Sequence, residues 1–186
     1  MAPAPSSDRL VWIDMEMTGL DPVRCLIIEI ATLVTDANLN LVAEGPSLTL
    51  HASEDELRSL SDWSRDTFTK SGLIERVRAS TISRTEGEAR TISFLREHVP
   101  AQSAPLCGNS VWNDRMFLIH GMPRLHEYLH YRNVDVSSFK EVIRRWHPAH
   151  YSPPVKKNKH DALSDIHESL EELRYYRDRF IAPREG

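Results

Sequence analysis

The chain has 186 residues, enough for one domain with a substantial hydrophobic core. Its hydrophobic content of 40% and charged content of 27% are typical of a globular protein, and no apolar run is long enough to span a bilayer. The formal net charge of −4 argues against a broad basic surface for long nucleic acids, but it is compatible with a very short one bound by metal ions and a few side chains.

Neither the cysteines nor the N-terminus indicates a secreted protein. Cys25 and Cys107 do not form a zinc motif and give no reason to expect a disulfide framework. Residues 1–8 are rich in Pro, Ala and Ser and contain no apolar h-region, so we expect a disordered arm. We therefore expect a cytoplasmic protein; a removed organelle presequence is the alternative.

The order of the predicted elements indicates one α/β domain over residues 9–181, with a short tail over residues 182–186. We expect Ser137 to cap the helix that follows it. Residues 148–159 contain three prolines and three lysines, which is typical of a loop or lid. The predicted strands are 9–15, 26–34, 41–50, 105–108 and 133–136. The predicted helices are 61–77 with a break at 71–72, 84–99, 114–120, 123–130, 138–146 and 160–179.

Two carboxylates, Asp14 and Glu16, lie at the end of the first predicted strand. Positions i and i+2 of a strand face the same side of the sheet, so both side chains point the same way. Two like charges 4 Å apart repel by roughly 4 kcal/mol at an effective dielectric constant of about 20. A proton, a base or a metal ion must relieve this repulsion, so the pair predicts a divalent-metal site.

Three further residues fit the opening pair. Asp114 lies at the start of a predicted helix, and Asp165 lies one turn into the last one, five residues after His160. Four carboxylates favour Mg²⁺ or Mn²⁺ over zinc, and two such ions support phosphoryl transfer. A histidine can accept a proton from the attacking water. Spacing alone leaves simpler interpretations open, since each of these residues is also common as a helix cap or on a solvated surface.

The set Asp14-x-Glu16, Asp114 and His160-x4-Asp165 resembles the DEDDh exonuclease superfamily, and the flanking sequence resembles its oligoribonuclease family most closely. The resemblance extends from about residue 10 to residue 180 and implies a ribonuclease H-like fold, a mixed five-stranded sheet flanked by helices. The matching stretches are 12–21, 28–36, 39–40, 43–46, 71–73, 108–110, 130–132, 135–137 and 144–146.

The resemblance implies 3′→5′ hydrolysis of short RNAs, especially dinucleotides, to 5′-mononucleotides. It implies that Asp14, Glu16, Asp114 and Asp165 hold two metal ions, with His160 as the general base. Among substrate contacts it assigns Leu20 as a wedge against a base and Trp63 as a stacking residue. It assigns the 5′ phosphate to Ser110, Arg132 and Ser137, and places Tyr131 across a homodimer interface.

The chain departs from the family pattern at Trp112, Asn113 and Phe68, which puts fine specificity in question rather than catalysis. Two other functions compete with the one that the family implies. A broader DEDDh exonuclease would trim longer RNA or single-stranded DNA, but it would be expected to have a basic groove. A silent RNA-binding module would be expected to have lost one of the four carboxylates or the histidine, and all five are present.

Overall fold

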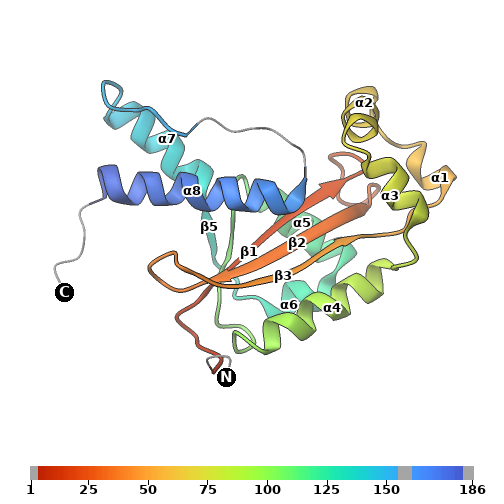
Figure 1. Cartoon of the computed structure of the whole chain (residues 1–186), viewed down its shortest axis with the longest axis horizontal. Helices are drawn as coiled ribbons and strands as arrows, with labels where there is room; N and C mark the ends of the chain where they lie inside the picture. Colours follow the sequence, from red (N-terminus) through yellow and green to blue (C-terminus); the bar gives the residue numbers. More distant parts are fainter. Residues whose placement is uncertain (1–3, 155–160, 182–186) are drawn as a thin grey trace.

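The computed structural model describes residues 4–154 and 161–181, and in this part of the chain a mixed five-stranded sheet carries helices on both faces (Figure 1). The strand order is β3-β2-β1-β4-β5. β1 pairs antiparallel with β2 and parallel with β4, which confirms the predicted mixed sheet. The strands are β1 (Leu10–Met17), β2 (Ile27–Thr35), β3 (Leu41–Thr49), β4 (Leu106–Gly108) and β5 (Asn133–Asp135). The helices are α1 (Glu54–Leu57), α2 (Asp62–Lys70), α3 (Leu73–Ala79), α4 (Arg84–Arg96), α5 (Trp112–Gly121), α6 (Pro123–Tyr128), α7 (Val136–Trp146) and α8 (Ala162–Phe180).

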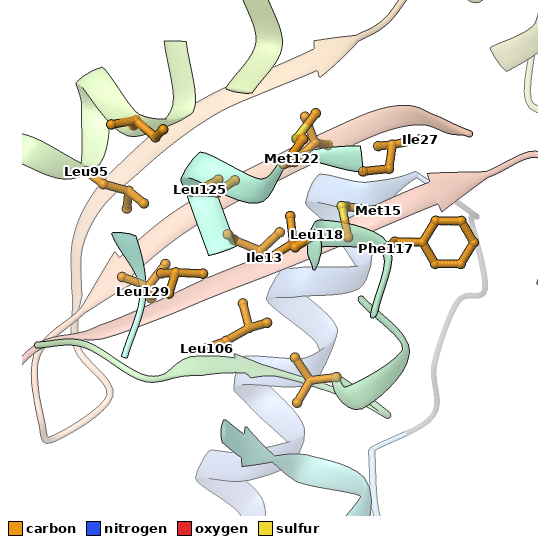
Figure 2. Close-up of a cluster of buried hydrophobic side chains, with 14 of the residues drawn as sticks. Ile13, Met15, Ile27, Leu95, Leu106, Phe117, Leu118, Met122, Leu125 and Leu129 are labelled. Carbon is orange, nitrogen blue, oxygen red and sulfur yellow. The ribbon is translucent and has the colours of Figure 1, made fainter. Parts of the chain in front are cut away.

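Side-chain alternation along β1 divides the core into two layers. Val11, Ile13 and Met15 point to the face covered by α4, α5 and α6, as Figure 2 shows for Ile13 and Met15. Trp12 points to the opposite face and packs in a second cluster with residues of α7 and α8. Because both faces are covered, the inner strand β2 is buried along its whole length and its sequence is almost continuously apolar. A third cluster joins α1, α2 and α3 to one end of β2.

Two features of the helices differ from the prediction, and both concern the residues that cap them. Ser137 is not the cap of α7, because Asp135 takes that place and its carboxylate accepts the Ser137 amide at 2.9 Å. The short helix α1 was not predicted, although Ser53 and Glu56 form a capping box, which is a sequence signal for the start of a helix.

The ends of the described segments bear on the predicted domain limits. Ser6, which lies within the predicted N-terminal arm, donates its amide to the carbonyl of His98 at 3.0 Å. The domain limits at residues 9 and 181 stay a prediction. The predicted loop 148–159 is described as far as residue 154 and is irregular there. In the described part of the chain, no helix combines the length and apolar character needed to cross a membrane.

Candidate metal centre and substrate pocket

β1 presents Asp14 and Glu16 on the face of the sheet that α8 covers. Trp12, two residues before Asp14, packs with α8, and strand alternation carries this direction to positions 14 and 16. The register agrees, since Asp14 lies opposite Ala31 of β2, which also packs against α8. The predicted shared face of the two carboxylates is therefore confirmed.

Asp165 reaches this pair from the first turn of α8. One carboxylate oxygen from each of Asp14, Glu16 and Asp165 lies within 4.8 Å of the others, and all three residues are half-buried. Oxygen ligands of this kind suit a hard divalent cation such as Mg²⁺ or Mn²⁺. We call these three residues the carboxylate triad. Its donor atoms fit the metal that the sequence predicts.

Burial and mutual repulsion perturb the acidity of the triad. The pKa of Glu16 is raised from 4.5 to about 8, chiefly by burial and then by the charges of Asp165, Glu29 and Asp114. A carboxyl that holds its proton at neutral pH ionises readily once a divalent cation lies beside it. The electrostatics of the site therefore favour a bound cation.

Asp114 lies in the first turn of α5, beside the triad rather than within it. Its side chain is buried, and burial raises the pKa of its carboxyl although the Met15 backbone amide hydrogen-bonds to it. Among the described residues, the group of carboxylates close enough to share one ion consists of the triad alone. Asp114 is nevertheless near enough to contribute to the raised pKa of Glu16. His160 lies outside the described residues.

Leu20 and Trp63 line one pocket of about 660 Å³ together with Glu16. Leu20 follows β1 and is 86% exposed, while Trp63 projects from α2 and is 63% exposed. Phe68 lines the same pocket from a buried position on α2. A large exposed apolar side chain and an exposed indole beside a carboxylate centre offer flat surfaces to nucleobases. We refer to this cavity as the base pocket.

Ser110 and Ser137 lie together beyond the C-terminal ends of β4 and β5. Their hydroxyls are 3.1 Å apart, and the Ser110 amide donates to both Ser137 Oγ and Asp135 Oδ1. Tyr131 and Arg132 instead precede β5, at its other end, where the Arg132 guanidinium lies 5.4 Å from the centre of the Tyr131 ring. The predicted phosphate-binding group is thus only partly assembled in one copy of the chain.

Two polar residues near these segments escaped the sequence reasoning. Arg115 is buried and donates to the carbonyls of His130 and Arg132, so it fixes the turn that carries Tyr131. Asn109 accepts the Ser137 hydroxyl at 3.1 Å. Arg115 directly follows Asp114, and Asn109 directly precedes Ser110. The spacing of these residues gives no sign of their contacts with distant segments.

Comparison with known proteins finds a matching family model and close relatives. The model of the RNase_T exonuclease family matches residues 11–173. An oligoribonuclease from Azoarcus sp. is 53% identical over 178 residues, which cover 96% of this chain and 98% of that protein. An oligoribonuclease from Escherichia coli K12 is also 53% identical and covers 95% of this chain and 97% of its own length.

Solved structures show the fold at lower sequence identity. The zinc-bound complex of Escherichia coli exonuclease I with single-stranded DNA aligns with a TM-score of 0.75 at 16% identity, over 94% of this chain and 41% of that one. Exonuclease I from Methylocaldum szegediense gives a TM-score of 0.72 at 19% identity, over 92% and 41%. This chain therefore spans about two fifths of those exonucleases. The family model and the curated relatives match nearly the whole chain, so the chain belongs to the oligoribonuclease family of exonucleases.

Proposed function

We propose that this chain is a metal-dependent 3′→5′ exoribonuclease that hydrolyses short oligoribonucleotides, above all dinucleotides, to 5′-mononucleotides. The observation that carries the proposal is the double position of Glu16, which belongs to the carboxylate triad and also lines the base pocket with Leu20 and Trp63. A nucleotide whose base enters that pocket brings its phosphodiester next to the carboxylates. Membership of the oligoribonuclease family supports the same substrate class.

We assign two divalent ions, Mg²⁺ or Mn²⁺, to the triad and Asp114. Such ions supply activation of a water molecule and stabilisation of the leaving 3′ oxygen. The protein's own part is to keep four carboxylates close together in a partly buried place, where they orient the ions. His160, five residues before Asp165, is proposed on sequence grounds as the group that accepts the proton of the attacking water.

The remaining residues orient the RNA. Leu20 separates neighbouring bases and Trp63 stacks on one of them, a contact that tolerates any base identity. The paired hydroxyls of Ser110 and Ser137 receive the 5′ phosphate. Because a capped 5′ end leaves no exit for a longer chain, this arrangement selects short substrates.

A homodimer completes the site in this proposal. Tyr131 and Arg132 lie at the end of β5 away from Ser137, and Tyr131 is 74% exposed. We propose that Tyr131 reaches the neighbouring active site and that Arg132 contributes to phosphate binding. A cytoplasmic location stays a prediction.

A broader exonuclease that trims longer RNA or single-stranded DNA is the alternative, favoured by the fold shared with an exonuclease I that is bound to single-stranded DNA. The net charge of −4 argues against it, because a long strand needs a basic groove. A series of 5′-phosphorylated RNAs from dinucleotide to decanucleotide separates the two. We expect much faster turnover of the dinucleotide with Mg²⁺ and none with a chelator. Equal rates at all lengths would favour the broader enzyme.

An Asp14→Ala variant tests the metal assignment in the same assay. It removes one triad oxygen donor and should abolish hydrolysis, whereas Asp178→Ala, an exposed carboxylate at the far end of α8, should leave the rate unchanged. Full activity of Asp14→Ala with Mg²⁺ would contradict the assignment.

A further inference from the structure

Glu29 is a buried carboxylate in the middle of the sheet, immediately beside the carboxylate triad. It is 3% exposed and interrupts the otherwise apolar start of β2. In the β1–β2 register it lies directly opposite Glu16, on the face that α8 covers. Two carboxylates in this cross-strand relation repel each other, so Glu29 requires strong partners.

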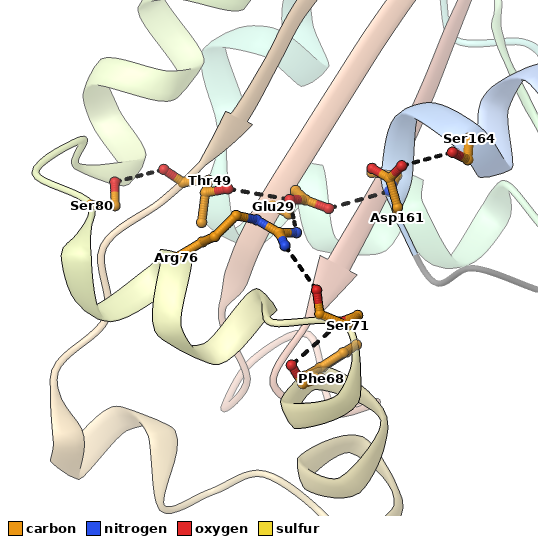
Figure 3. A network of polar contacts seen from close by, with 9 residues as sticks. Glu29, Thr49, Phe68, Ser71, Arg76, Ser80, Asp161 and Ser164 are labelled. Atoms are coloured by element: carbon orange, nitrogen blue, oxygen red, sulfur yellow. Dashed lines mark hydrogen bonds and ion pairs between the residues drawn. The ribbon is translucent and has the colours of Figure 1, made fainter.

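Those partners come from three different elements, as Figure 3 shows. Glu29 Oε1 accepts Arg76 Nη2 of α3 at 3.0 Å and the hydroxyl of Thr49 in β3 at 3.2 Å. Glu29 Oε2 accepts the backbone amide of Ala162, the first residue of α8, at 3.2 Å. The carboxylate is thus a junction of β2, β3, α3 and α8.

The contact with Ala162 fixes the start of α8. Asp161 stands at the N-cap position, but its side chain makes no capping bond to the helix amides and instead accepts the Ser164 hydroxyl at 2.7 Å. Glu29 therefore satisfies the first free amide of the helix from a neighbouring strand and places a negative charge at its positive end. Asp165 is three residues further along the same rigid turn, so its position depends on this contact.

Arg76 extends the junction to the base pocket. Its Nη1 donates to the carbonyl of Ser71 at 3.0 Å, and Ser71 is the C-cap of α2, the helix that carries Trp63 and Phe68. One guanidinium thus joins the carboxylate that holds the start of α8 to the helix that forms a wall of the base pocket (Figure 3).

From these contacts we infer that Glu29 and Arg76 are positioning residues, which set Asp165 against Asp14 and Glu16 and hold α2 in register with the resulting metal centre. The inference rests on the proposed function, in which the triad binds divalent ions. Neither residue is assigned a contact with substrate.

Charge and position predict opposite effects when Arg76 is removed, and this separates the two explanations. Loss of a cation near the triad should strengthen binding of a divalent ion if only charge matters. Loss of the ion pair between Arg76 and Glu29 should weaken binding of the divalent ion if position matters. The carboxylate that holds the start of α8 would then have no cation beside it. Removal of groups that orient metal ligands costs 10- to 100-fold in affinity in other metalloproteins, so we expect about 10-fold or more here.

The test is a calorimetric titration of metal-free protein with Mn²⁺, which needs no turnover. Arg78→Ala is the matched control, since Arg78 lies on the same helix, is 41% exposed against 44% for Arg76, and pairs with Glu54 and Glu75 instead. We expect Arg76→Ala to bind Mn²⁺ about 10-fold or more weakly. Arg78→Ala should match the wild type, and Arg76→Lys, which keeps a cation beside Glu29, should recover most of the loss.

Two different failures can be told apart in this titration. Wild-type affinity or tighter binding in Arg76→Ala, in a protein whose circular dichroism is unchanged, would overturn the positioning inference and leave the metal site standing. Equal Mn²⁺ binding by wild type and Asp14→Asn would overturn the proposed metal site itself, and the inference with it.

Discussion

Raising the pH of the metal-free protein from about 5 to about 8 should lower its free energy of unfolding, because folding keeps a proton on Glu16. The unfolded chain releases this proton near the ordinary pKa of 4.5, whereas the folded chain releases it near 8. Between these values the folded state binds more protons at Glu16 than the unfolded state, so the contribution of Glu16 to stability is fully present below 4.5 and is lost as the pH rises to about 8. Each pH unit in the interval costs up to about 1.4 kcal/mol, or roughly 4 to 5 kcal/mol in all.

Urea unfolding at several pH values, with a chelator or with Mn²⁺, measures this decline. Glu16→Gln is the control because its amide does not titrate, so the difference between the two proteins cancels other groups. Among these are His98 and His126, whose pKa values are lowered by burial and which act in the opposite direction. Mn²⁺ should remove the decline by replacing the proton. Parallel profiles for wild type and Glu16→Gln without metal would show that folding does not keep a proton on Glu16.

Three further changes test the substrate contacts and the packing. Trp63→Ala should raise the KM for a dinucleotide by about 5- to 150-fold, since stacking on a base is worth about 1–3 kcal/mol. Trp146→Ala, which removes another exposed tryptophan, should leave the KM unchanged, and equal effects would refute the stacking role. Arg132→Ala should reduce the preference for a 5′-phosphorylated over an unphosphorylated dinucleotide, and an unchanged ratio of kcat/KM values would count against phosphate binding. Gly45→Ala should lower stability by about 1–3 kcal/mol in urea unfolding, because a Cβ atom there would lie 2.5 Å from the Phe94 ring; wild-type stability would show that the ring moves aside easily.

The parts of the site that follow from local rules were predictable from the sequence. A strand fixes the direction of every second side chain, so the shared face of Asp14 and Glu16 follows from their spacing alone. The helical position of Asp165 followed from the apolar spacing of α8 in the same way. Its approach to the pair did not, because it depends on how a helix near the C-terminus packs on the first strand.

Contacts between distant segments were the parts that sequence reasoning missed. The importance of Glu29 arises from its register against Glu16 and from partners in α3 and α8, and no local pattern encodes either. Ser137 was predicted as a cap because hydroxyls cap helices well. Asp135, two residues earlier, is also a good capping residue, and it is the one that caps α7. The proposed role of Tyr131 depends on a second copy of the chain, which the fold of one copy does not specify.

The proposed function requires that Asp14, Glu16 and Asp165 hold divalent ions beside the base pocket. Anomalous diffraction from crystals soaked in Mn²⁺ tests it directly, because the signal locates the metal itself. We expect peaks in contact with the carboxylates of the triad, with Asp114 close to a second ion. A crystal that shows Mn²⁺ elsewhere and none at the triad, from protein whose hydrolysis of dinucleotides requires Mn²⁺, would contradict it.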